Sequence, residues 1–350
     1  MTAGTLDGPA NDLPAESPGG PDAAPRPVHD VDLVIVGAGP AGLYGAYYAG
    51  FRGMSVALID SLPEPGGQVA ALYPEKDIFD IAGYPAVKGQ ALVDALVAQA
   101  GQAEPLYLLG ESALELRHDA ESVEVVTDAG TRVRAKALLL TGGIGTFTPR
   151  ELPAGGEYLG RGLRYFVRKL DELAGQDVVV VGGGDSAVDW ALALEPIARS
   201  LTLVHRRDAF RAHEHSVARL QASSVRVLTP FEVAGIAGDD RIAEVTVERV
   251  RSGERVTLPA QTVVAALGFI ADLGPVQKWG LDLRKRHVLV DRSMRTNLER
   301  VFAAGDISDY DGKVRLISVG FGEAAAAVNN LAPLVNPAFG TVPGHSSDAS

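Results

Sequence analysis

The sequence of 350 residues has no cysteine. Disulfide bonds, cysteine-ligated zinc, iron–sulfur clusters held by the chain and dithiol relays all need cysteine sulfur, so each is excluded. Long apolar runs are also missing, and none approaches the roughly 20 residues that a membrane-spanning helix needs. Residues 1–29 have neither the basic start nor the apolar core of a secretory signal. We therefore expect a cytoplasmic protein without membrane attachment.

The chain has fewer basic than acidic residues. The chain has 32 Lys and Arg against 44 Asp and Glu, which gives a formal net charge of −12. General nucleic-acid binding is disfavoured, because phosphate contacts need clustered cations. The same acidity would slow the approach of an acidic protein partner unless a local basic patch steers it.

Glycine, by contrast, is abundant, with 40 residues, several of them in turns that follow apolar strands. Such turns suit nucleotide binding, whereas residues 1–29, rich in Pro, Gly, Ala and Asp, are typical of a disordered tail. Hydrophobic content of 46% with 22% charged residues is enough for substantial cores. The length allows two or three domains.

The first glycine-rich turn follows the apolar stretch 32–36. Its residues include Gly37, Gly39, Pro40 and Gly42. A helix is predicted next, and a second apolar stretch then ends in Asp60, 18 residues after the last glycine. This pattern is a complete strand–turn–helix–strand fingerprint. Asp60 is expected to accept hydrogen bonds from ribose hydroxyls, as in the AMP half of FAD or in NAD.

The second glycine-rich turn follows four consecutive valines, 178–181, which are typical of a buried parallel strand. Its predicted nucleotide contacts are Gly182, Gly184, Asp185, Ser186 and Ala187. The next strand ends 20 residues after Gly184, where an NAD-binding unit would carry an acid. The residues found there are His205, Arg206 and Arg207, with Arg211 close behind. Guanidinium groups suit a 2′-phosphate, so we predict NADP; a basic turn at the solvated end of a strand is the alternative.

The chain has two such fingerprints, one that ends in an acid and one that ends in basic residues. Together they imply two different dinucleotides. FAD and NADP are the usual pair for a hydride relay. The alternative is a duplicated fold with one dead site, although both glycine sets are intact. The expected fold class is α/β, with two Rossmann-like dinucleotide-binding domains of three layers (ββα). The FAD domain is expected to be discontinuous, with the NADP domain inserted in it.

Apolar strands that end in glycine mark the two crossings between these domains, after residues 138–143 and 262–269. The predicted arrangement is a disordered tail over 1–29, an FAD-binding domain over 30–148 and 270–334, an NADP-binding domain over 149–269 and a C-terminal extension over 335–350. Residues 213–215 (His-Glu-His) suggest a metal site, but three adjacent ligands converge poorly on one helix face. No metal is predicted.

A further carboxylate, Asp306, directly follows an apolar stretch and Gly305. Ligands of open α/β sheets bind at such strand ends, so Asp306 is a candidate partner for the ribityl hydroxyls of FAD; a turn or helix-capping aspartate is the alternative. A helix is expected to start behind Gly320 and Gly322, with its N-terminus pointing at the flavin.

Five blocks, residues 37–42, 66–76, 182–191, 205–215 and 302–306, together resemble the pyridine-nucleotide disulfide oxidoreductases of the thioredoxin-reductase-like branch. Within that branch, residues 30–350 are most similar to bacterial ferredoxin–NADP reductases. Thioredoxin reductases carry a Cys-x-x-Cys motif shortly before the second glycine turn, whereas residues 162–167 here contain no sulfur. The resemblance therefore implies that electrons leave directly from the flavin.

The resemblance also assigns residues to the cofactors. It implies FAD contacts from Asp60, Gly67, Gln68, Tyr73, Phe147 and Asp306. Tyr73 would stack on one face of the flavin. The other face would be covered by His345 of the partner subunit in a homodimer, with Ser346 and Ser347 near the edge of the ring. From its position alone, His345 would be a solvated tail histidine.

The implied activity is transfer of electrons between NADPH and ferredoxin through FAD. Alternatives are an NADPH-dependent reductase of flavodoxin, quinone or another small acceptor, and a non-enzymatic NADP-sensing flavoprotein. Ferredoxins are usually acidic, so a basic patch is needed, and the candidates are Arg161, Arg164, Arg168 and Lys169, and residues 284–286. Hinges between the domains are expected near residues 146–150 and 268–271.

Overall fold

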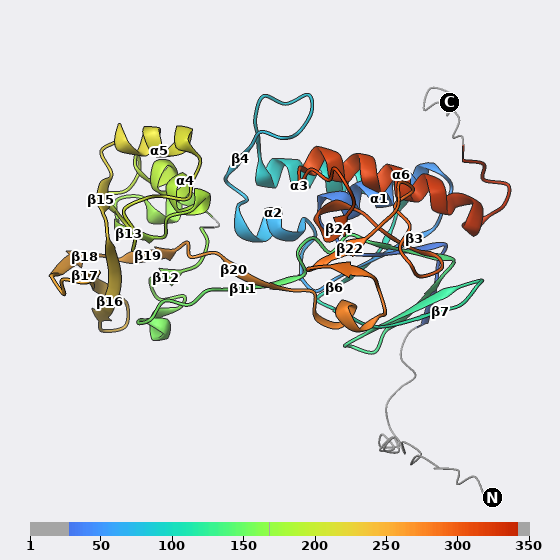
Figure 1. The fold of residues 1–350 in the computed structure, drawn as a ribbon, viewed down its shortest axis with the longest axis horizontal. Helices are drawn as coiled ribbons and strands as arrows, with labels where there is room; N and C mark the ends of the chain where they lie inside the picture. Colours follow the sequence, from blue (N-terminus) through green and yellow to red (C-terminus); the bar gives the residue numbers. More distant parts are fainter. Residues whose placement is uncertain (1–27, 168, 342–350) are drawn as a thin grey trace, which may run out of the picture.

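The computed structural model describes residues 28–167 and 169–341, without the side chains of residues 146–148 and 271. Figure 1 shows two lobes joined by a pair of strands, β11 (Thr146–Pro149) and β20 (Phe269–Asp272). These two strands pair antiparallel, so the chain leaves the first lobe and returns to it side by side. No helix in the described ranges is long and apolar enough to cross a membrane.

The first lobe is built on a five-stranded parallel sheet in the order β23-β10-β2-β3-β6. Its strands are β2 (Leu33–Val36), β3 (Val56–Asp60), β6 (Leu106–Leu109), β10 (Ala137–Leu140) and β23 (Val301–Ala303). Helices α1 (Pro40–Phe51), α3 (Gly89–Ala100) and α6 (Ile317–Val335) cover one face, as Figure 1 shows. The other face packs against an antiparallel sheet of β7 (Ala113–His118), β8 (Val123–Thr127) and β9 (Arg132–Ala135), to which β1 (Val28–Asp30) adds in parallel.

Alternation along the parallel strands divides the core of this lobe into two layers. Leu33, Ile35 and Leu139 point into the helix layer, whereas Val34 and Leu138 point toward the antiparallel sheet. Because both faces are buried, these strands are apolar throughout, as their sequence indicated.

The second lobe repeats the plan. Its parallel sheet has the order β12-β19-β13-β14-β15. The strands are β12 (Leu163–Arg164), β13 (Asp177–Val181), β14 (Ser200–Val204), β15 (Arg226–Leu228) and β19 (Thr262–Ala265). Helices α4 (Asp185–Leu194) and α5 (Glu214–Gln221) pack on one face, and the antiparallel strands β16 (Phe231–Gly238), β17 (Ile242–Arg249) and β18 (Arg255–Pro259) pack on the other. The predicted fold class is thereby confirmed, with three layers in each lobe and the first lobe interrupted by the second.

Short elements complete the fold. They are α2 (Gly67–Leu72), β4 (Asp77–Ile78), β5 (Val87–Lys88), β21 (Leu283–Arg284), β22 (His287–Leu289) and β24 (Ser308–Asp309), with the 3₁₀ turns η1 (Gly101–Ala103), η2 (Gly156–Tyr158), η3 (Leu170–Leu173), η4 (Gly274–Lys278) and η5 (Gly305–Ile307). One contact between the lobes is an ion pair from Lys76, between α2 and β4, to Asp189 in α4 at 2.5 Å.

The start of α6 differs from the prediction. The helix begins at Ile317, so Gly320 and Gly322 lie inside it rather than ahead of it. The cause is Asp80, whose carboxylate accepts the Ile317 N–H at 2.7 Å and so caps the helix from 237 positions away in the chain. No local pattern around residue 317 signals such a remote cap.

The first strand of the second lobe supplies a test of stability. Asp177 begins β13, and its carboxylate accepts hydrogen bonds from Arg199 and from Ser200 Oγ at 2.7 Å. The Arg199 guanidinium lowers the pKa of Asp177 from 3.8 to about 2. Since the folded pKa is below the unfolded one, this stabilisation is complete above pH ~4 and disappears as the pH falls toward 2.

We therefore predict that Asp177→Asn lowers the free energy of unfolding at neutral pH, and that the difference from wild type shrinks between pH 4 and pH 2. Chemical denaturation at a series of pH values measures both quantities. A difference that stays constant across this pH window would contradict the assigned role.

Candidate cofactor sites

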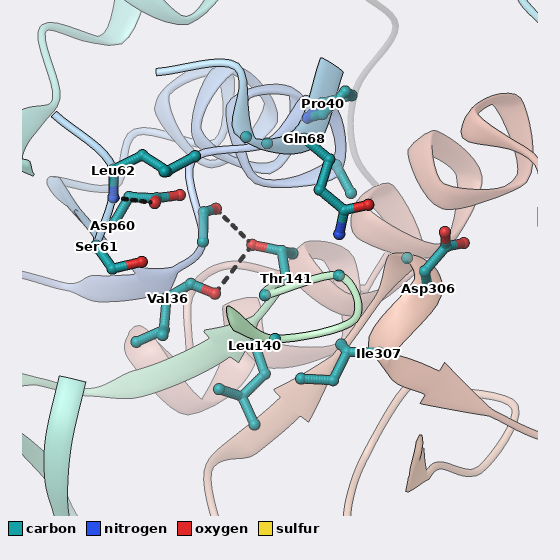
Figure 2. A pocket seen from close by; sticks show the side chains of 18 of the residues that line it. Val36, Pro40, Asp60, Ser61, Leu62, Gln68, Leu140, Thr141, Asp306 and Ile307 are labelled. Atoms are coloured by element: carbon teal, nitrogen blue, oxygen red, sulfur yellow. Dashed lines mark hydrogen bonds between the residues drawn. The ribbon is translucent and has the colours of Figure 1, made fainter. Parts of the chain in front are cut away.

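A cavity of about 360 Å³ opens at the carboxyl ends of the parallel strands in the first lobe. It is lined by residues that follow β2, β3, β10 and β23, which is where ligands of open α/β sheets bind. Figure 2 shows Asp60 and Asp306 at opposite ends of this pocket, with Thr141 and Gln68 between them. The pocket is thus elongated, with a carboxylate at each end.

The first glycine turn forms one wall of the pocket. Gly37 has φ +112°, and a Cβ there would lie 2.5 Å from the backbone oxygen of Thr141. A Cβ on Gly42 would overlap the backbone oxygen of Gly37. Helix α1 starts at Pro40 with Gly39 as its N-cap and no side-chain cap. The first-turn N–H groups of α1 therefore have no side-chain partner and lie at the pocket, as a pyrophosphate requires.

Asp60 closes one end of the pocket. Its two carboxylate oxygens each accept one backbone N–H, from Ala38 at 2.6 Å and from Leu62 at 2.8 Å. Burial raises the pKa of Asp60, and these two N–H groups oppose the rise. A carboxylate has about four lone-pair sites, so Asp60 can still accept hydrogen bonds from ribose hydroxyls.

Helix α2 packs against the glycine turn and lines the pocket. Gly66 and Gly67 both have positive φ, and Gly66 N–H donates to Ala38 O at 2.8 Å, which brings α2 against the turn. Gln68 and Tyr73, at the two ends of α2, line the pocket. Burial, followed by the charges of Asp306 and Asp80, raises the pKa of Tyr73 to about 12.

Tyr73 lies between the two lobes as well as at the pocket. Its ring packs against the helix-side core of the first lobe and against the α4-side core of the second. The predicted FAD contacts Asp60, Gln68, Tyr73 and Asp306 are thus gathered around one pocket. The Phe147 side chain, His345, Ser346 and Ser347 lie outside the described parts of the chain, so their predicted roles stay predictions.

An ion pair buried beneath the Asp306 turn was missed by the sequence analysis. The side chains of Lys313 and Glu323 are 2% and 4% exposed, and they contact each other through Nζ and Oε1. Glu323 also accepts the Gly305 N–H at 2.8 Å and the Tyr310 hydroxyl at 2.7 Å. Lys313 Nζ donates to Gly305 O at 3.0 Å. Charged side chains therefore hold both backbone polar atoms of Gly305, one residue before Asp306.

This clamp also fixes the approach of α6. Gly305 has φ +78°, a conformation that favours glycine, and a Cβ on Gly320 of α6 would lie 3.4 Å from the Gly305 Cα. Glu323 is on the next turn of the same helix. The pocket-lining start of α6, at Ile317 and Gly320, is thus locked to the Asp306 turn.

The second glycine turn has the same backbone design in the second lobe. Gly182 has φ +153°, and a Cβ there would overlap the backbone oxygen of Ala266. Helix α4 starts at Asp185 with Gly184 as an N-cap that makes no side-chain bond. The Asp185 carboxylate accepts the His213 N–H at 2.8 Å and so ties the start of α5 to the turn. Across the described ranges, no group of three or more His, Asp or Glu side chains could hold a metal ion.

The basic triplet divides into two kinds of residue. His205 is 9% exposed, its Nε2 lies 3.2 Å from Ala209 O, and a Cβ on Gly183 would overlap its ring. Burial, followed by the charges of the neighbouring arginines, lowers the pKa of His205, so the ring is neutral at pH 7 and supports the turn by packing.

The arginines of this segment face solvent. Arg206, Arg207 and Arg211 are exposed, and none makes an ion pair or a side-chain hydrogen bond within the described parts of the chain. The backbone of Arg211 is fixed, because its N–H donates to Gly183 O at 2.7 Å. Three unpaired guanidinium groups thus stand beside a helix N-terminus that has no side-chain cap.

The family model of the pyridine nucleotide-disulphide oxidoreductases matches residues 31–329. The chain belongs to the pyridine nucleotide-disulphide oxidoreductase family. It is 64% identical to the ferredoxin–NADP reductase of Frankia alni over 318 residues, which are 91% of this chain and 99% of that protein. It is 65% identical to the ferredoxin–NADP reductase of Frankia casuarinae over 316 residues, 90% of this chain and 98% of that protein. Thioredoxin reductase of Lactococcus lactis has a similar structure, with TM-score 0.72, 27% identity and coverage of 87% of this chain and 99% of that one.

This member of the pyridine nucleotide-disulphide oxidoreductase family has no cysteine, so no disulfide of its own can take part in its reaction. The residues around the first pocket fit an FAD molecule: an uncapped helix start for the pyrophosphate, Asp60 for a ribose and Asp306 at the far end. The second turn fits a pyridine dinucleotide, with free arginines in place of the acid that an NAD site carries.

The clamp generates a prediction on stability and cofactor binding. Lys313→Met should lower the free energy of unfolding by about 3–5 kcal/mol, because it leaves the Glu323 carboxylate buried without its cation. The variant should also purify with less FAD, since the turn before Asp306 loses a support. Denaturation curves and the ratio of flavin to protein absorbance measure the two effects.

Two further variants sharpen this test. The double variant Lys313→Met/Glu323→Gln should be more stable than Lys313→Met alone, because no unpaired charge is left. Lys88→Met removes an exposed ion pair with Asp77 at 3.0 Å and should cost less than about 1 kcal/mol. Strictly additive losses in the double variant would mean that the two charges do not act as a pair.

Proposed function

We propose that this protein is a ferredoxin–NADP reductase, which uses FAD to transfer electrons between NADPH and ferredoxin. The observation that carries the proposal is the pair of glycine turns in one chain. The strand after the first turn ends at Asp60, and the strand after the second turn is followed by three unpaired arginines. The absence of cysteine excludes a dithiol step in the chain. The relatives with 64% and 65% identity, matched over nearly their whole length, are ferredoxin–NADP reductases, which supports ferredoxin as the partner.

The chain's own residues would bind and orient the two cofactors. In the first lobe, the start of α1 would hold the FAD pyrophosphate, and Asp60 and Asp306 would hold hydroxyl groups. In the second lobe, Arg206, Arg207 and Arg211 would bind the 2′-phosphate of NADPH. Bound FAD supplies the chemistry that accepts a hydride and gives up single electrons. No side-chain base is needed, since the protein contributes positioning and electrostatics.

The two lobes would act as the domains predicted above, with boundaries at 148/149 and 269/270. Each boundary falls within a strand of the β11–β20 pair, so these strands would form the hinge. Tyr73 and the Lys76–Asp189 ion pair would be the contacts that change when the lobes move relative to each other.

A homodimer and coverage of the flavin by His345 of the partner subunit complete the proposal. Gly340 and Thr341, directly before the tail, support it because they are held away from the chain's own pocket. Arg52 Nη2 donates to Gly340 O at 2.6 Å, and Asn329 Nδ2 donates to Thr341 O at 2.7 Å. The chain is therefore anchored next to the C-terminal end of α1, away from the pocket-lining start of its own α6.

The 2′-phosphate assignment predicts a change in coenzyme preference. Arg206→Ala/Arg207→Ala should raise the KM for NADPH at least ~10-fold, because each guanidinium–phosphate contact contributes on the order of 1.5–3 kcal/mol. The KM for NADH should change little. The neighbouring Arg219→Ala variant, in the last turn of α5, is a matched control. Equal effects on both coenzymes would contradict the assignment.

The function is tested by NADPH-driven reduction of cytochrome c with and without added bacterial ferredoxin. We predict strong dependence on ferredoxin, and poor activity with NADH. If the flavin bleaches with NADPH but cytochrome c stays oxidised in the presence of ferredoxin, the two cofactors are retained and ferredoxin is the wrong acceptor. Flavodoxin and quinones would be assayed next.

A further inference from the structure

A group of cations lies on the first lobe between the β21–β22 hairpin and the start of α6. Arg284 ends β21, Lys285 follows it in the hairpin turn with φ 59°, and β22 pairs with β24. The carboxylate of Asp309 in β24 is shared by Arg284 at 3.5 Å and Arg315 at 3.4 Å. One carboxylate thus draws two guanidinium groups from distant segments to the same place.

This basic group is continuous with the rim of the FAD pocket. Arg315 directly precedes Leu316 and Ile317, which line the pocket. Val314 and Leu316, on either side of Arg315, are 53% and 44% exposed. Large apolar side chains are seldom left exposed next to one another without a partner, and here they alternate with a cation at the mouth of the pocket.

The patch is richer in cations than the chain as a whole. Arg284, Lys285 and Arg315 are exposed cations, and Asp309 and Asp311 are the carboxylates that pair with Arg284 and Arg315. The protein as a whole has a net charge of −12. A negatively charged partner would be repelled by most of this protein and attracted here.

The rival basic cluster in the second lobe contributes none of its described residues to the lining of the FAD pocket. Arg164 pairs with Glu172 at 2.5 Å, and Arg161 donates to Glu157 O at 2.6 Å and lies over the Tyr158 ring. Arg161 and Lys169 are both exposed, and the charge of Lys169 acts on Glu172. Arg168 lies outside the described residues.

We propose that Arg284, Lys285, Arg315, Val314 and Leu316 form the docking surface for an acidic one-electron carrier protein. The proposal rests on the function proposed above and names the surface through which that function is exercised. The cations would steer and orient the acidic carrier, and the exposed apolar pair would pack against it beside the pocket. Electron-transfer complexes typically have small, transient interfaces, so a patch of five residues suits them.

The test compares matched charge changes in the holoenzyme. Lys285→Glu and Arg315→Gln, singly and together, should lower kcat/KM for ferredoxin roughly tenfold or more at low ionic strength, and should flatten its dependence on salt. The rate of NADPH-driven ferricyanide reduction, which needs no protein partner, should stay unchanged. Lys136→Glu, an exposed lysine after β9, should leave both rates unchanged.

Lys169→Glu tests the rival cluster with the same change of charge. A larger loss of kcat/KM in Lys169→Glu than in Lys285→Glu, or an unaltered kcat/KM in the double variant at low ionic strength, would overturn the docking surface while the reductase function stands. Failure of the wild-type enzyme to reduce ferredoxin, with normal ferricyanide reduction, would instead overturn the proposed function and the docking surface with it.

Discussion

The buried contact between Lys313 and Glu323 fixes the first lobe where the turn before Asp306 meets the start of α6. Both charges are removed from water, which is costly unless each finds several partners. Here Glu323 accepts from Gly305, Tyr310 and Lys313, and Lys313 also donates to Gly305 O. The turn before Asp306 and the start of α6 are fixed together as a result. The pocket wall, its far carboxylate and the basic rim at Arg315 all depend on this support.

The two lobes show how one backbone design serves two dinucleotides. Each places a glycine turn and an uncapped helix start at the end of a buried parallel strand. The difference lies one strand further along the chain. Asp60 offers a partly hydrogen-bonded carboxylate, whereas the second lobe has the neutral His205 at the corresponding position and free guanidinium groups directly after it. A carboxylate would repel a 2′-phosphate and the guanidinium groups attract one, so this segment sets the coenzyme preference.

Much of the fold and part of the site could be predicted, because their causes are local. The valine run at 178–181 needs burial on both faces. Gly37 and Gly182 must be glycine because each has positive φ and leaves no room for a Cβ next to a neighbouring backbone. The rest depends on contacts between distant segments. Asp80 caps α6 from 237 positions away, and Lys313 meets Glu323 only once the Gly305 turn and α6 are packed together. His205 looked like part of a cationic triplet, yet it is neutral because Gly183 leaves room for its ring in the core.

The central claim is that electrons enter as a pair from NADPH and leave singly to an acidic carrier without any cysteine relay. An anaerobic single-turnover experiment tests it most directly. Holoenzyme reduced with one equivalent of NADPH is mixed with excess oxidised ferredoxin, and the absorbance of both proteins is followed. We predict that the flavin absorbance returns completely and that two ferredoxins are reduced for each flavin. A flavin that stays bleached while ferredoxin remains oxidised would contradict the account.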